Sequence, residues 1–184
     1  MTALRPAVFL DRDGVLNAVV WRDGKAASPR TVEELRIEPD ALAALTTLKA
    51  AGYLLLVVTN QPDVSRGLMS HLALDTLHDR LFQALPVDDI AACRHDNADA
   101  CNCRKPKPGL ILGMAARHGV DLSRSWMVGD QDRDIQCGQA AGCRTILLDR
   151  TYNSGRAADA DHTLETLSQT ISVIVGPPTL ATAK

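Results

Sequence analysis

Short apolar runs alternate with stretches of helical periodicity along most of the chain. The apolar runs predict buried strands at 7–10, 53–58, 89–93, 126–128 and 145–148. Helical spacing and helix-ending residues predict helices over 40–52, 71–85, 108–119 and 133–142, and a last strand and helix within 161–175. Ser70 is expected to be the N-cap of the second helix. Nearly continuous apolar strands separated by helices predict an α/β fold in three layers, with a parallel sheet covered by helices on both faces.

The other segments do not fit this alternation. Residues 17–38 are polar and irregular and are expected to form a surface flap, while 177–184 is expected to be a frayed tail. We expect one domain over residues 1–176, because 184 residues are enough to bury one core.

Composition and charge exclude several classes of protein. The net charge of −2 gives no general attraction to nucleic acid or to anionic membranes. The longest apolar runs are too short to span a bilayer, and the first residues lack the apolar core of a signal peptide. We therefore expect a cytoplasmic protein, in which the five cysteines are metal ligands or packing residues rather than disulfides.

Chemically active side chains follow several of the predicted strands. In a parallel sheet the carboxyl ends of the strands share one edge, which is where such sheets bind ligands. Clustered carboxylates repel one another unless a cation lies among them, and their oxygens suit Mg²⁺. The residues in these positions are Asp11, Asp13, Thr59, Asn60, Arg104, Lys105, Asp130 and Asp134.

Four segments resemble the motifs of the haloacid dehalogenase superfamily of phosphatases. "VFLDRDGVL" matches the first motif, "VVTN" the second, "RKP" the third and "VGDQDRD" the fourth. The resemblance covers roughly residues 7–150, and four motifs in the right order are far more specific than a lone D-x-D pair. It implies a Rossmann-like sheet and a Mg²⁺-dependent phosphomonoesterase.

The resemblance also implies a role for each motif residue. Asp11 would attack phosphorus and form an aspartyl-phosphate, and Asp13 would protonate the leaving alcohol. Mg²⁺ would bind the Asp11 carboxylate, the Asp13 backbone carbonyl and Asp130.

The remaining motif residues would support the phosphoryl group. Lys105 would supply positive charge, and Thr59 and Asn60 would donate hydrogen bonds to phosphoryl oxygens. Asp134 would orient Lys105 or the metal waters rather than bind the metal. Two plainer interpretations stay open, in which Thr59 merely ends a strand and Asp134 is an acid at a helix N-terminus.

Two pairs of soft ligands precede the basic pair Arg104-Lys105. Cys93-x-His95 and Cys101-x-Cys103 would give tetrahedral Zn²⁺ four protein ligands and no open position, so the expected site is structural. The same arrangement directly before "RKP" resembles the heptose bisphosphate phosphatase and histidinol-phosphatase branch of the superfamily. We expect the zinc to fix the loop that carries Lys105. Cys137 and Cys143 are expected to pack in the core, and the helical histidines 71, 78 and 118 are not expected to be ligands.

The substrate site is expected to be open. Only 45 residues, 14–58, lie between Asp13 and Thr59, which leaves no room for a cap domain. Selectivity would then come from loops 15–31, 61–68 and 94–104. The candidate substrate contacts are Asn17, Asn60, Gln61, Arg66 and Arg104, whereas a solvated charged face is the favoured interpretation of Arg22, Lys25 and Arg30.

The branch resemblance implies a sugar bisphosphate. D-glycero-D-manno-heptose 1,7-bisphosphate, cut at the 7-phosphate by a monomeric enzyme, is the first choice. This chain departs from its relatives in one loop, where "QPDVSRG" (61–67) stands in place of the frequent Gln-Ser-Gly-Ile-Ala-Arg-Gly. Two alternatives therefore stay open, a histidinol-phosphate phosphatase and a catalytically silent, zinc-stabilised interaction module.

Overall fold

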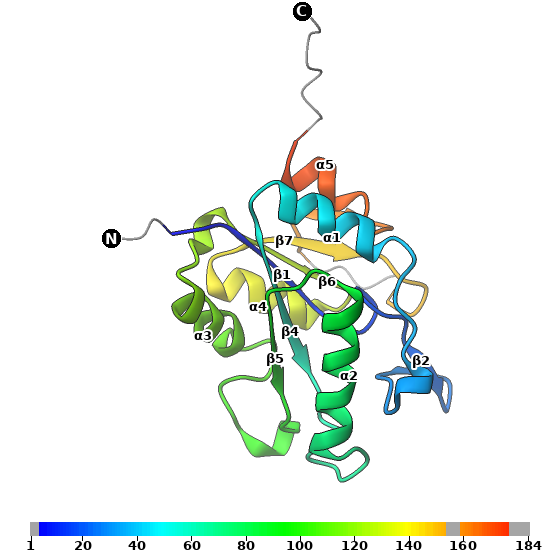
Figure 1. Ribbon diagram of the computed structural model, residues 1–184. Coiled ribbons are helices and arrows are strands. Elements are labelled where there is room, and N and C mark those ends of the chain that lie inside the picture. Colours follow the sequence, from blue (N-terminus) through cyan, green and yellow to red (C-terminus); the bar gives the residue numbers. More distant parts are fainter. Residues whose placement is uncertain (1–3, 154–158, 177–184) are drawn as a thin grey trace, which may run out of the picture.

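A six-stranded parallel sheet with helices on both faces forms the body of the protein (Figure 1). The computed structural model describes residues 4–153 and 159–176. The strand order is β5-β4-β1-β6-β7-β8, and every neighbouring pair is parallel. The strands are β1 (Ala7–Leu10), β4 (Leu54–Asn60), β5 (Asp89–Cys93), β6 (Trp126–Gly129), β7 (Arg144–Leu148) and β8 (His162–Leu164). The predicted three-layer α/β fold is confirmed.

The helices lie close to where periodicity placed them. Ser70 caps α2 as expected, since its hydroxyl accepts a hydrogen bond from the Ala73 amide at 3.0 Å. Helix α3 ends at Gly119, whose φ of +64° is one that glycine adopts without strain. The α-helices are α1 (Ala41–Ala50), α2 (His71–Ala84), α3 (Gly109–His118), α4 (Asp132–Ala141) and α5 (Thr170–Ile174). The 3₁₀ turns are η1 (Val32–Glu34), η2 (Asn97–Asp99) and η3 (Leu122–Arg124).

The sheet separates two apolar layers, because successive side chains of a strand point to opposite faces. Val8 and Leu10 of β1 pack with α1, the end of α2 and α5. Ala7 and Phe9 of the same strand pack with α3 and α4 on the other face. All four side chains are fully buried, so the carboxyl end of β1 is fixed between two packed layers.

The segment 17–38, called the flap below, is more structured than the sequence indicates. It contains a short antiparallel hairpin, β2 (Val20–Arg22) and β3 (Lys25–Ala27). Its second half packs Val32 and Leu35 against the apolar cluster beside α2, and its first residue, Asn17, is fully buried. The segment lies at the surface as expected, but the expectation that it is irregular is wrong for the hairpin, and Asn17 is buried. Sparse apolar residues without periodicity gave no signal for this packing.

No cap domain is present between β1 and β4. All residues of that interval are described, and they form the flap, α1 and their connections. The single domain over 1–176 stays a prediction, and the expected tail 177–184 lies outside the described residues. Within the described part of the chain, no helix is long and apolar enough to cross a membrane.

Candidate active site and metal centre

A buried lysine contacts β4, the residue that follows β1, and the first turn of α4. Lys105 Nζ lies 2.9 Å from Asp11 Oδ1 and 2.7 Å from Asp134 Oδ1, and it donates to the Val58 carbonyl at 2.8 Å. The Lys105 side chain is fully buried. Although burial disfavours the charge, the carboxylates of Asp11 and Asp134 raise the lysine pKa above its ordinary value. The sequence prediction that Asp134 orients Lys105 is consistent with this contact.

The backbone of Lys105 is held by Asn60. The Asn60 Oδ1 accepts from the Lys105 amide at 3.0 Å, and its Nδ2 donates to the Lys105 carbonyl at 3.1 Å. Both ends of the side-chain amide are therefore engaged by the backbone. Asn60 was expected to contact the phosphoryl group, which stays a prediction; it lines the cavity described below and holds the Lys105 backbone.

Three buried acids meet beside the lysine. One carboxylate oxygen each from Asp11, Asp130 and Asp134 lies within 4.8 Å of the others. Burial, reinforced by mutual repulsion among the acids and opposed by Lys105, raises the pKa of Asp11 to about 7. Burial and the charge of Asp134 raise the pKa of Asp130 to about 6. A bound divalent cation would offset the repulsion among the three carboxylates, and the all-oxygen donor set fits Mg²⁺.

Close approach of the chain at Gly129 makes this cluster possible. A Cβ at Gly129 would lie 2.1 Å from the Cβ of Asp134, so no larger residue fits between β6 and the first turn of α4. The same limit holds at Gly14, where a Cβ would lie 2.2 Å from the Tyr152 hydroxyl and 2.5 Å from Asp130 Oδ2. The glycines of the first and fourth motifs thus allow the acids to converge.

Asp13 is surrounded by hydrogen-bond donors. The Arg12 guanidinium donates to both of its oxygens at 2.9–3.0 Å. Asn17 donates to Oδ1 at 3.0 Å, while Ser28 and Gln61 donate to Oδ2 at 2.7 and 2.8 Å. Although burial opposes ionisation, these donors hold the pKa of Asp13 below its ordinary value. Asn17 and Gln61, expected as substrate contacts, are fully buried and engage Asp13.

Gln61 also orients the Thr59 hydroxyl through a hydrogen bond. Its Nε2 donates to Thr59 Oγ1 at 2.9 Å, so the hydroxyl oxygen accepts from Gln61 and its own hydrogen is available for donation. Thr59 is fully buried at the end of β4. The hydroxyl of Tyr152 lies beside Asp130, and both residues line the cavity described below.

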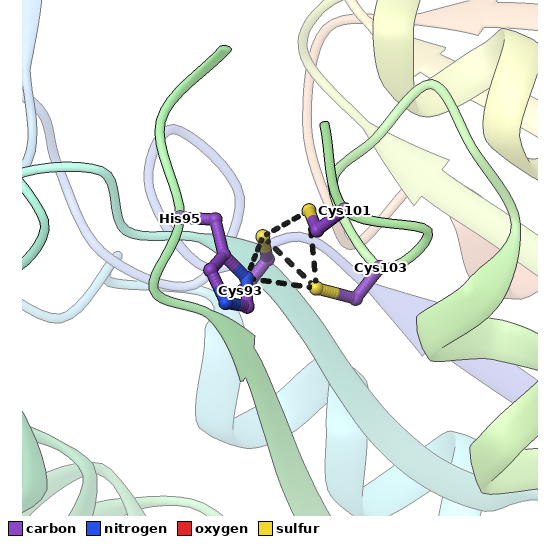
Figure 2. A group of neighbouring side chains, drawn as sticks. All are labelled: Cys93, His95, Cys101 and Cys103. Atoms are coloured by element: carbon purple, nitrogen blue, oxygen red, sulfur yellow. Dashed lines mark hydrogen bonds between the residues drawn. The ribbon is translucent and has the colours of Figure 1, made fainter. Parts of the chain in front are cut away.

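The four predicted zinc ligands converge at the end of β5 (Figure 2). The sulfur atoms of Cys93, Cys101 and Cys103 lie 3.2–3.6 Å apart. His95 Nδ1 is 3.3 Å from the Cys103 sulfur and 3.7 Å from that of Cys93. A regular tetrahedron with Zn–S bonds of 2.3 Å has edges of about 3.8 Å, close to these separations. The cluster is therefore consistent with a zinc site.

Ion pairs tie the loop 94–104, called the zinc loop below, to its surroundings. Arg66 Nε donates to Asp96 Oδ2 at 2.7 Å, and Arg94 pairs with Asp75 of α2. Arg104 donates to Asn97 Oδ1 at 2.7 Å and to the His95 carbonyl at 3.2 Å, so it braces the loop from within. The Cys/His cluster is thus one of several groups of contacts that fix the chain before Lys105.

The other cysteines and the helical histidines have different partners. Cys137 and Cys143 lie in the core between the sheet and α4, as predicted. The three histidines contact neighbouring polar side chains: His71 with Arg94, His78 with Arg12, and His118 with Asp89.

A cavity of about 430 Å³ opens beside Asp11 and Asp130. Arg66 and Arg104, the arginines expected to contact the substrate, line it. The flap residues Arg22, Lys25 and Arg30, for which a solvated charged face was the favoured interpretation, line it too, and Lys25 is exposed to solvent.

One acid of the loop after β4 organises two of the cavity arginines. Asp63 pairs with Arg30 at 2.7 Å and with Arg66 at 3.6 Å. Sequence reasoning noted Asp63 as a departure, but nothing in the pattern indicated its partners. It also missed the role of the buried Arg12, which lies between Asp11 and Asp13, and the contact of Ser28 with Asp13, because the residue types alone do not indicate these partners.

Comparisons with known proteins agree with this arrangement. The HAD-hydrolase-like family model matches residues 102–170. A D-glycero-beta-D-manno-heptose-1,7-bisphosphate 7-phosphatase of Rhodopseudomonas palustris is 39% identical over 150 residues, covering 75% of this chain and 80% of the relative. The protein of that name from Bordetella bronchiseptica is 37% identical over 146 residues, covering 77% and 79%. A crystal structure of D,D-heptose 1,7-bisphosphate phosphatase from B. bronchiseptica, complexed with magnesium and phosphate, matches with a TM-score of 0.80 and 31% identity over 92% of this chain and 98% of that one.

Proposed function

Because the chain belongs to the HAD-like hydrolases, in the branch of the D,D-heptose 1,7-bisphosphate phosphatases, we propose that it removes the 7-phosphate of D-glycero-β-D-manno-heptose 1,7-bisphosphate. The single observation that carries this proposal is the contact of a buried aspartate with a buried lysine at the sheet edge, 2.9 Å between Asp11 Oδ1 and Lys105 Nζ. The β anomer follows the names of the relatives.

Asp11 is the nucleophile in this proposal. An oxygen of its carboxylate attacks phosphorus, the bond from phosphorus to the sugar oxygen breaks, and an aspartyl-phosphate forms. Water then attacks the phosphorus and releases inorganic phosphate. In its protonated form Asp13 gives a proton to the leaving sugar oxygen in the first step. As the carboxylate that Arg12, Asn17, Ser28 and Gln61 stabilise, it takes a proton from the water in the second.

Positive charge must balance an anion attacking an anion. Lys105 supplies it from a fixed position, and the free hydrogen of the Thr59 hydroxyl is donated to a phosphoryl oxygen. Asp11, the Asp13 backbone carbonyl and Asp130 would hold Mg²⁺, which when bound neutralises charge on the phosphoryl oxygens.

The cavity favours a doubly phosphorylated substrate. Arg66 and Arg104 face a space beside the reacting acids, and the flap adds three further cationic side chains. Arginines recognise phosphate through paired hydrogen bonds. This lining disfavours histidinol phosphate, whose amine is cationic, and the intact acids and lysine disfavour a silent interaction module. We propose Arg66 and Arg104 as contacts of the remote part of the sugar.

Zinc has a structural role in the proposal. The four ligands of the zinc loop leave no open position for chemistry, and the loop leads directly into Lys105. Thiolate ligands are stable in a reducing compartment, which supports a cytoplasmic enzyme. We propose a monomer, because the site is assembled within one chain.

Phosphate release from a panel of substrates tests the function. The panel contains sugar mono- and bisphosphates, histidinol phosphate and nucleotides, each with and without Mg²⁺. We expect the heptose bisphosphate to have the highest kcat/KM, and preference for histidinol phosphate would contradict the proposal. Asp11→Asn should lower turnover more than about a hundredfold, a loss of roughly 2.7 kcal/mol, with an unchanged circular dichroism spectrum. Turnover above a hundredth of wild type would exclude Asp11 as nucleophile.

A further inference from the structure

Ser28 is held at the cavity by one hydrogen bond to its carbonyl and by two ion pairs of neighbouring flap residues. Arg22 donates to the Ser28 carbonyl at 2.6 Å and pairs with Glu34 of η1. Two residues further on, Arg30 Nε is bound to Asp63 Oδ2 at 2.7 Å, which ties the flap to the loop after β4. The position of Ser28 is therefore fixed by the flap itself and by a neighbouring loop.

The partners of Asp13 fall into two groups. Arg12, Asn17 and Gln61 are fully buried, and none of them lines the cavity. Ser28 is half-buried, and it lines the cavity together with Asp13. Among these four partners, Ser28 alone thus meets Asp13 on the side from which a substrate arrives. Its hydroxyl donates to Asp13 Oδ2 at 2.7 Å, the shortest of the contacts to this carboxylate.

We propose that Ser28 is a positioning residue for Asp13, and that the flap is therefore part of the apparatus that protonates the leaving alcohol. The inference rests on the proposed function, in which Asp13 is the acid. In that step the bond from Asp11 to phosphorus forms, the phosphorus–sugar bond breaks with its electron pair going to the sugar oxygen, and the proton of Asp13 goes to that oxygen. Ser28 holds the carboxyl group turned toward the cavity while this occurs.

The proposal has a signature that a purely structural role lacks. An alkyl leaving oxygen is strongly basic and needs the proton, whereas 4-nitrophenolate leaves readily without one. The ratio kcat/KM includes the steps up to departure of the leaving group, so it reports the proton transfer and not the later hydrolysis of the aspartyl-phosphate. Displacing Asp13 should therefore affect the sugar phosphate selectively.

The experiment compares the two substrates in one preparation of each variant. Ser28→Ala is expected to lower kcat/KM about tenfold for the sugar phosphate that the wild type hydrolyses best, the effect of losing about one hydrogen bond at the acid. For 4-nitrophenyl phosphate the change should be less than about twofold. Ser28→Thr keeps the hydroxyl and should recover most of the sugar phosphate activity. Because both rates come from one preparation, their ratio is independent of the folded fraction.

Two reference variants separate the possible failures. Asp13→Asn must show the same selective loss, more strongly; if it slows both substrates equally, the proposed acid fails, whatever Ser28 does. Ser65→Ala removes a matched hydroxyl, which donates to Asp99 Oδ2 at 2.9 Å, and should leave the ratio unchanged. If Asp13→Asn is selective while Ser28→Ala changes neither substrate, or slows both equally, the Ser28 inference is overturned and the proposed function stands.

Discussion

Removing the side-chain amide of Asn60 should displace Lys105 without changing the lysine residue itself. Asn60 Oδ1 and Nδ2 bond the amide and the carbonyl of Lys105 at 3.0 and 3.1 Å. In Asn60→Ala both hydrogen bonds are lost, while the zinc loop and the lysine side chain stay chemically intact. The substitution therefore tests how far the position of Lys105 depends on these two hydrogen bonds.

The two lost hydrogen bonds set the size of the effect. Each contributes about 0.5–1.5 kcal/mol, so the free energy of unfolding should fall by about 1–3 kcal/mol. A displacement of the lysine ammonium group by about 1 Å can cost on the order of a hundredfold in rate. Since the Lys105 side chain keeps its contacts with Asp11 and Asp134, we expect kcat to fall by roughly ten- to a hundredfold.

Urea denaturation and turnover of a small aryl phosphate measure the two effects together. Asn102→Ala is the matched control, because Asn102 is an exposed asparagine of the zinc loop and lies three residues before Lys105. It should change the unfolding free energy by less than about 0.5 kcal/mol. If Asn60→Ala weakens substrate binding but leaves stability unchanged, Asn60 contacts the phosphoryl group directly. That result would refute the positioning role.

Three further outcomes are expected. Protein purified without a metal-affinity tag should contain close to one zinc per chain by elemental analysis. Replacing Cys101 and Cys103 should lower the zinc content and the activity, and added Mg²⁺ should not restore the activity. If the zinc content and the activity are both retained, the structural role of zinc is contradicted. Arg104→Ala should lower kcat/KM for a sugar bisphosphate by roughly ten- to two-hundredfold while a small aryl phosphate changes little, and equal loss would indicate that the arginine only braces the zinc loop. The pKa values of Asp11 and Asp130 are raised to about 7 and about 6, so the folded state keeps protons that the unfolded chain releases near the ordinary value of 3.8. Without Mg²⁺, the free energy of unfolding should therefore fall as the pH rises from about 4 to about 7. Saturating Mg²⁺ should weaken this trend. Denaturation curves at pH 5 and pH 8 with and without Mg²⁺ check it, and stability that rises with pH in its absence would count against the buried acid cluster.

The positions of the strand ends could be predicted from the sequence, because the pattern of apolar residues indicates where each strand ends. Near-continuous apolar runs predict parallel strands, and parallel strands bring their carboxyl ends to one edge. That was sufficient to place Asp11, Thr59, Lys105 and Asp130 together. The zinc ligands could be predicted for a similar reason, since tight pairs of Cys and His have few other uses in a reduced protein.

The loop contacts were not accessible in this way. Ser28 and Asp63 lie in segments without periodicity, and their partners are determined by how the flap folds back over the sheet edge. Arg30 carries the same charge whether it is solvated or turned toward the cavity, so its identity alone cannot distinguish the two. The sequence placed Asn60 beside the site but gave no sign of its contacts with the Lys105 backbone, because an amide can serve a ligand or a backbone equally well.

Asp63 has a consequence for how such a site changes over generations. Its carboxylate is shared by Arg30 of the flap and Arg66 of its own loop, and Arg66 in turn reaches Asp96 of the zinc loop. A single substitution at position 63 would remove the carboxylate partner of Arg30, whereas Arg66 would keep its contacts with Asp96. We expect replacements at position 63 to be accompanied by replacements at position 30, so that new substrate preferences arise through paired changes in the flap and the loop after β4.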